Sequence, residues 1–140
     1  MRGNLPISLL SSIYNVSMTL NTKPKPTTYT IDATDRTLGR VASEAAHALL
    51  GKRSVHYAQN QAIPVTVTIN NAAKLHLPSR RTKGKVYTRY TGYPGGFYET
   101  SMDEMITKKG IAEVVKKTVD GMIPRNKLRK PRMKNLVVNA

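Results

Sequence analysis

The sequence predicts a small α/β domain. Residues 65–69 read Val-Thr-Val-Thr-Ile, and such strict alternation of polar and apolar residues is typical of a β-strand with one buried face. Two stretches, at about 38–50 and 111–122, place apolar residues at helical spacing. Strand-like and helical segments follow one another in the order β-α-β-β-α-α, which favours an α/β domain.

The first half of the domain is expected to begin with a short β-type run at 29–32. Residues 34–37 read Thr-Asp-Arg-Thr and supply turn and helix-capping side chains. The helix that follows has one apolar face, made by Leu38, Val41, Ala42, Ala45 and Leu49. Gly51 is suited to end this helix, because glycine readily adopts the left-handed conformation that closes a helix.

The second half is expected to begin with a third strand, Val86–Tyr90, bounded by glycines. Residues 101–104 read Ser-Met-Asp-Glu and match the capping box S-x-x-E. The capping box predicts a short helix that ends at Gly110. The longer helix at about 111–122 is then stopped by Pro124.

The two ends of the chain differ in character. Residues 125–135 are strongly basic and are predicted to be partly helical, and 136–138 could add a final edge strand. Residues 1–28 are mildly apolar and match neither a clear secretory signal nor an organelle presequence. We expect this extension to be poorly ordered, with a true start at Met18 as the favoured interpretation. Residues 29–140 are predicted to form one domain.

The charge of the chain is strongly basic and unevenly distributed. Among 140 residues there are 23 Lys and Arg against 8 Asp and Glu, a formal net charge of +15. Residues 45–98 carry eight basic residues and 121–140 carry six, and neither stretch has a single carboxylate. Such segregation indicates a polyanionic partner, most commonly nucleic acid. A merely solvated basic face is the alternative.

Several classes of site are not predicted. The chain has no Cys, which excludes disulfides, a thiol nucleophile, a Cys-ligated zinc and an iron–sulfur cluster. No run of 18 apolar residues predicts a membrane-spanning helix. Phosphate-loop and dinucleotide-binding glycine motifs are missing, and the three histidines form no zinc-binding pair. We therefore predict no catalytic residue, no metal and no cofactor.

The most unusual segment is 80–98. It holds five of the eight aromatic residues together with five basic ones, and it includes a loop with three glycines around one proline. Basic side chains neutralise phosphates, tyrosines stack on unpaired bases, and glycine allows close backbone approach. The alternative is a basic hairpin whose tyrosines pack into the core. We expect one or two of its four tyrosines to be structural.

Six motifs together resemble one family. They are Ile31–Ala33, Thr37–Ser43, Leu50–Lys52, Asn71–Ala72, Arg89–Gly96 and Gly121–Pro124. In order and spacing they resemble the bacterial form of large-subunit ribosomal protein thirteen, over about residues 29–138. The hexapeptide T-G-Y-P-G-G at 91–96 is the most specific of them. The sequence departs from the family pattern at 56–64 and at the basic turn 78–81.

The resemblance implies a non-enzymatic protein with a three-layer α/β/α core around a small, mostly parallel four-stranded sheet. It further implies binding to large-subunit ribosomal RNA early in assembly, with neighbouring ribosomal proteins as further partners. Matching positions imply RNA contacts at Lys52, Arg89, Gly92, Tyr93, Gly95 and Gly96. Local match and charge add Arg53, Arg80, Arg81, Lys83, Lys85, Arg125, Lys127, Arg129, Lys130, Arg132 and Lys134.

Other functions stay open at this point. A nucleic-acid-binding protein outside the ribosome, including a DNA-associated architectural protein, would use the same charge. A small enzyme acting on nucleotides would need a convergent set of polar groups that the sequence does not display. We expect a ribosomal location in the cytoplasm, with an organellar ribosome as the alternative, and neither membrane binding nor self-assembly.

Overall fold

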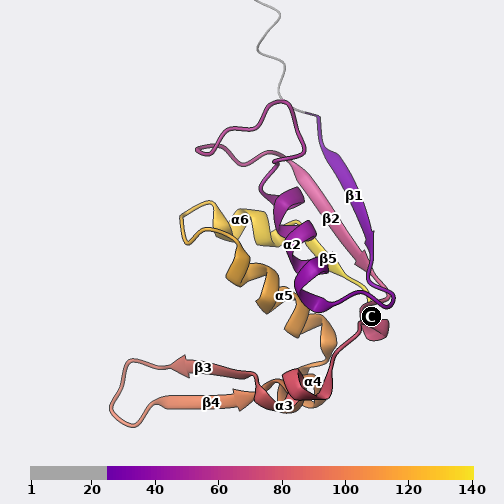
Figure 1. The fold of residues 1–140 in the computed structure, drawn as a ribbon. Helices are drawn as coiled ribbons and strands as arrows, with labels where there is room; N and C mark the ends of the chain where they lie inside the picture. Colours follow the sequence, from indigo (N-terminus) through magenta and orange to yellow (C-terminus); the bar gives the residue numbers. More distant parts are fainter. Residues whose placement is uncertain (1–24) are drawn as a thin grey trace, which may run out of the picture.

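Two separate sheets organise the computed structural model, which describes residues 25–140 (Figure 1). The first sheet is parallel and has the strand order β1-β2-β5. Its strands are β1 (Thr27–Asp32), β2 (Val65–Asn70) and β5 (Leu136–Val138). The second is an antiparallel hairpin of β3 (Val86–Tyr90) and β4 (Phe97–Ser101). The predicted α/β class is therefore confirmed, while the expectation for residues 1–24 lies outside the described residues.

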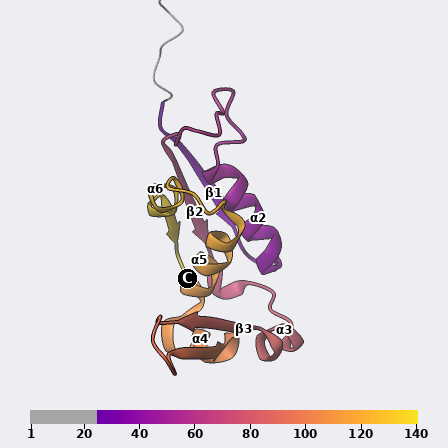
Figure 2. The same ribbon diagram turned by 90° about the vertical axis from the view of Figure 1, so that its left-hand side faces the viewer.

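The two main helices pack against the same face of the parallel sheet. Helix α2 (Leu38–Leu49) connects β1 to β2, and α5 (Ile111–Met122) lies in the connection from β2 to β5. Each connection leads to the next strand on the same side of the preceding one. Because both crossovers are right-handed, both helices lie on one face of the sheet. Figures 1 and 2 show α2 and α5 side by side over this face.

This layering corrects one expectation. In residues 25–140 the parallel sheet has three strands, not four, because β3 pairs with β4 in its own hairpin. The other face of the sheet is uncovered in this part of the chain, so the domain has two layers where three were expected. Threonines line that face, at positions 28, 30, 66 and 68, with Val137 about half exposed on the edge strand.

The core lies between the sheet and the two helices. Val65, Val67 and Ile69 alternate with polar residues on β2 and are buried, as their spacing predicts. The buried side chains of α2 are mostly alanines, which let it lie close to α5. From α5, valines complete the core, namely Val114, Val115 and Val119.

The shorter helices have local causes. Helix α4 (Met102–Lys109) begins where the Ser101 hydroxyl accepts a hydrogen bond of 3.2 Å from the Glu104 N–H, which confirms the predicted capping box. Helix α6 (Arg129–Lys134) lies in the stretch 125–135 that was predicted to be partly helical, whereas the 3₁₀ turn η1 (Ala72–Lys74) was not predicted. Helix α3 (Ser79–Gly84) was not predicted, because none of its residues is buried and its sequence has no apolar period.

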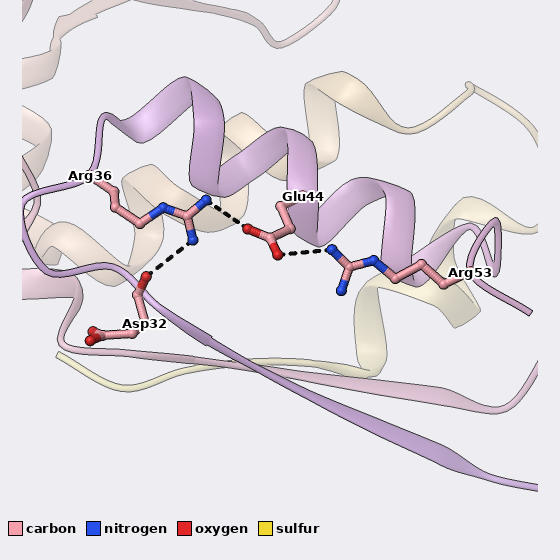
Figure 3. A network of polar contacts seen from close by, with 4 residues as sticks. All are labelled: Asp32, Arg36, Glu44 and Arg53. Atoms are coloured by element: carbon pink, nitrogen blue, oxygen red, sulfur yellow. Dashed lines mark hydrogen bonds and ion pairs between the residues drawn. The ribbon is translucent and has the colours of Figure 1, made fainter.

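Glu44 anchors the two ends of α2 to the chain around it (Figure 3). Its carboxylate accepts hydrogen bonds from Arg36, at 2.7 Å, and from Arg53, at 2.8 Å. The same Arg36 guanidinium donates to the backbone carbonyl of Asp32 at 3.4 Å. The hydrogen bond from Arg36, followed by that from Arg53, lowers the pKa of Glu44. Its partners are thus two arginines that flank the helix on either side.

The Asp32 carboxylate links the ends of β1 and β2. One of its oxygens accepts hydrogen bonds from the Asn71 side-chain amide at 3.0 Å and the Thr34 hydroxyl at 2.8 Å. The Thr34 N–H adds a third at 3.1 Å. These donors, with Asn71 the strongest, lower the Asp32 pKa to about 2.

Candidate nucleic-acid interface

The β3–β4 hairpin extends from the body of the domain (Figure 1). Its register places Tyr90 opposite Phe97 on one face and Arg89 opposite Tyr98 on the other. The side chains of Tyr90, Phe97 and Tyr98 are 57–63% exposed, and Tyr93 in the turn is 75% exposed. Large aromatic groups rarely gather in water on one projecting element, so the hairpin is suited to contact a partner.

The turn between these strands depends on its glycines. Gly92 and Gly95 adopt φ values of +92° and +74°, which side chains of ordinary residues disfavour. The N–H of Gly96 donates to the Tyr93 carbonyl at 3.0 Å, and the N–H of Thr91 donates to the Gly96 carbonyl at 3.0 Å. The turn is therefore compact, and it presents Tyr93 outward.

Tyr87 has a structural role that separates it from the other tyrosines of the hairpin. It is half-buried and packs against the core. The ammonium groups of Lys117 and Lys85 lie 4.6 and 5.6 Å from the centre of its ring. One of the four tyrosines at 87–98 is thus structural, within the expected one or two, and the other three are exposed.

A basic segment lies at the base of the hairpin. Arg80, Arg81 and Lys83 on α3 are exposed, as is Lys85 just before β3. A shallow groove of about 460 Å³ runs along this segment and is lined by Pro78, Arg80, Arg81, Gly84 and Lys85. Helix α3 contacts both β4 and α4, so this basic segment adjoins the hairpin.

The second basic region lies at the other end of α5 (Figure 1). Arg125, Lys127, Lys130 and Lys134 are exposed there. A cavity of about 650 Å³ is lined by Asp120, Arg125, Asn126, Arg129, Lys130, Met133 and Lys134. A helix of the length of α5 spans about 18 Å. The two basic regions are thus separate surfaces that can contact different parts of one large partner.

Three of the predicted contact residues are already engaged within the protein. Arg129 forms a bidentate ion pair with Asp120. Arg53 pairs with Glu44 and stacks its guanidinium 5.5 Å from the centre of the Tyr29 ring. Arg132 is only 3% exposed, because α6 turns it toward the interior. It therefore does not belong to the outer basic surface.

Lys52 lies on a smaller cavity beyond the end of α2, and this cavity shares Asn126 with the cavity of the second basic region. Sequence reasoning missed its neighbours Tyr57, Gln59 and Asn126, which line the same cavity. They come from the 51–64 loop and from the segment after α5, and no spacing in the sequence links them to Lys52. Only the folded chain brings them together.

Other kinds of site find no support in the described chain. No group of three or more His, Asp and Glu side chains within residues 25–140 could hold a metal ion. None of the helices in this range is both long enough and apolar enough to cross a bilayer.

The chain is similar to known ribosomal proteins. The sequence profile of the family described as Ribosomal protein L13 matches residues 15–140. The large ribosomal subunit protein uL13 of Hahella chejuensis (strain KCTC 2396) is 38% identical over 125 residues, which cover 87% of both chains. The protein of the same name from Ralstonia pickettii (strain 12J) is 41% identical over 112 residues, covering 80% of this chain and 78% of that protein. The profile match includes part of the segment 1–28, for which the motifs gave no counterpart.

Proposed function

Because the chain belongs to the ribosomal protein L13 family, a family of structural and non-enzymatic proteins, we propose that it binds large-subunit ribosomal RNA and supports early assembly of the large subunit. In this proposal it stays in the finished subunit, where neighbouring ribosomal proteins also contact it. The motif-based resemblance to this family is confirmed. RNA binding and assembly are the steps that the proposal adds.

The projecting hairpin is the observation that carries the proposal. It combines exposed aromatic rings, a glycine turn and cations, and Glu99 is the single carboxylate of its two strands. Exposed tyrosines can stack on unpaired bases, while Arg89 and the cations of α3 neutralise nearby phosphates. A glycine turn with its backbone accessible lets the hairpin tip approach a folded RNA closely.

The mechanism that follows is electrostatic clamping combined with recognition of RNA shape. The hairpin region and the α6 region lie at opposite ends of α5, so each can neutralise a different stretch of backbone. If about eight phosphates are neutralised, log K should fall by roughly 6–7 per unit of log salt concentration. That slope distinguishes many phosphate contacts from a few.

Sedimentation of a lysate through a sucrose gradient tests the proposal, with mass spectrometry of this protein across the fractions. We expect its peak in the large subunit, retained through a moderate-salt wash. Recovery only at the top of the gradient would overturn the ribosomal role. Filter binding to purified large-subunit ribosomal RNA, repeated over a range of salt, then measures the slope. Equal affinity for duplex DNA would favour a general nucleic-acid-binding protein instead.

A further inference from the structure

Arg132 is a buried cation without a carboxylate partner among residues 25–140. Its side chain is 3% exposed, and one terminal nitrogen, Nη2, donates a hydrogen bond of 3.0 Å to the backbone carbonyl of Gln61. Its Nε is buried and has no hydrogen-bond partner in this part of the chain. Burying an unpaired charge costs much more than burying a paired one. An anion that is bound in the functional state would remove this cost.

Arg132 lines a cavity that is suited to an anion. The cavity has a volume of about 330 Å³ and is lined by Leu50, Lys52, Tyr57, Gln59, Pro124, Asn126 and Arg132. This lining contains two cations and no carboxylate. The amides of Gln59 and Asn126 and the hydroxyl of Tyr57 can each donate a hydrogen bond. The volume is at the low end of the range for small-ligand pockets, which suits a single small group.

The surrounding loop is held in place before any ligand arrives. The 51–64 loop is a long irregular connection, a type that is usually functional when it is ordered. Arg132 fixes it at Gln61, and Gly51 fixes it by contact with Ile63. A Cβ at Gly51 would lie 2.7 Å from the Ile63 side chain, so the two segments are in tight contact. Two points of the loop, at Gln61 and Ile63, are thus held by the rest of the fold.

We propose that the cavity between Lys52 and Arg132 binds one phosphate group of the RNA backbone. A guanidinium is suited to phosphate because it offers several donors in a plane, and Lys52 at the rim adds a second charge. The assignment rests on the proposed function for the source of the phosphate. In this role Arg132 differs from the exposed cations, because it is a buried side chain at the bottom of a cavity that opens at the surface.

Two variants and a control test the site in the full chain. Arg132→Met keeps the volume without the charge, and replacing a buried ion by a well-packed apolar side chain is often neutral for folding. Lys52→Gln removes the exposed cation at the rim and decides the test should Arg132→Met fail to fold. Lys74→Gln, in η1 near the opposite end of α2, removes one exposed charge away from the cavity.

The first measurement is thermal unfolding in inorganic phosphate and in chloride at equal ionic strength. We expect phosphate to raise the Tm of the wild type and of Lys74→Gln more than chloride does. Because phosphate also stabilises proteins by exclusion from their surface, Lys52→Gln and Arg132→Met should retain only a part of this difference. Equal Tm values of the wild type in the two salts, or an undiminished phosphate effect in both cavity variants, would overturn the site.

The second measurement is the affinity of the same four proteins for large-subunit ribosomal RNA. We expect about tenfold or greater loss in the cavity variants, the size of effect expected for a charge-assisted hydrogen bond. Lys74→Gln should lose much less. A phosphate effect without any loss of RNA affinity would assign the cavity to free phosphate and overturn its RNA role. Failure of the wild type itself to bind RNA would overturn the proposed function, while the phosphate measurement would still decide the site.

Discussion

The N–H of Thr91 donates a hydrogen bond of 3.0 Å to the carbonyl oxygen of Gly96, and this pair closes the turn of the β3–β4 hairpin. A Cβ atom on Gly96 would overlap the Thr91 hydroxyl and lie 3.0 Å from the Tyr93 carbonyl oxygen. The turn thus has no room for a side chain at this position. The shape of the turn, and with it the direction of Tyr93, therefore depends on the absence of a side chain at residue 96.

Gly96→Ala should weaken RNA binding through this overlap. Thr91 would have to rotate away, and the strain of about 1–3 kcal/mol corresponds to a loss of about 5- to 150-fold in affinity if binding needs the present turn. Filter binding with large-subunit ribosomal RNA measures the effect. Gly121→Ala is the control, because a Cβ at Gly121 in α5 meets nothing within 4 Å and the residue lies outside the hairpin and its groove. Equal affinity of both variants would contradict the prediction.

At Gly95 the constraint is backbone conformation and not space. A Cβ there meets nothing within 4 Å, but φ is +74°. Valine disfavours this region, whereas asparagine tolerates it better than most residues. We expect Gly95→Val to reduce RNA affinity more than Gly95→Asn does. The two variants would show the same loss if the side chain, and not the backbone, mattered.

Truncation of Tyr98 should affect RNA affinity, whereas truncation of Tyr87 should affect thermal stability. Tyr98 is 60% exposed, so Tyr98→Ala should leave the Tm nearly unchanged and cost about 1–3 kcal/mol of RNA binding if a base stacks on it. Tyr87 packs against the core and the Lys117 ammonium, so Tyr87→Ala should lower the Tm. Thermal unfolding and RNA titration of both variants check this. A large Tm loss in Tyr98→Ala would show that its ring is structural.

Arg129 and Lys130 are neighbours with different expected effects. Arg129 is paired with Asp120, and the two side chains are 25% and 36% exposed. Arg129→Ala should therefore lower the free energy of unfolding by about 0.5–1 kcal/mol, whereas Lys130→Ala should change it by less than about 0.5 kcal/mol. Urea denaturation measures both values. Indistinguishable stabilities would mean that the ion pair contributes nothing in solution.

Asp32 should contribute to the pH dependence of stability. Its pKa falls from 3.8 to about 2 on folding, so the folded state favours the charged form. The contribution is fully present above the unfolded pKa and is lost as the pH falls from about 4 to about 2. Asp32→Asn should be less stable than wild type at neutral pH, and the difference should shrink over this interval. Urea denaturation at several pH values measures it, and a constant difference down to pH 2 would contradict the assignment.

Much of the fold could be predicted because local patterns were strong. The alternation at 65–69, the apolar faces of α2 and α5 and the capping box at Ser101 each have one short-range physical cause, and each is confirmed. The expected three layers were wrong. The number of layers depends on which edge of the sheet β5 joins, because that edge decides on which face the connecting helix lies. That choice is a long-range property of the chain.

The candidate site likewise has parts that the sequence could predict and parts that it could not. Charge segregation and the glycine-rich turn, both visible in the sequence, predicted the hairpin and the α6 region as the surfaces for a partner. The interior position of Arg132 could not be predicted, because the cations around it in the sequence, Lys130 and Lys134, are exposed. Only the packing of α6 against the 51–64 loop turns it inward, and sequence proximity carries no information about that contact.

The position of β5 in the sheet has a consequence for how the chain is made. Strand β5 is an edge strand that pairs with the central β2, yet it is synthesised after α4, α5 and α6. Until it emerges, the nascent chain holds β2 with one open edge and part of its core uncovered. The parallel sheet therefore closes only after α6 has been made, and a truncation before Leu136 should yield a chain that depends on chaperones to avoid aggregation.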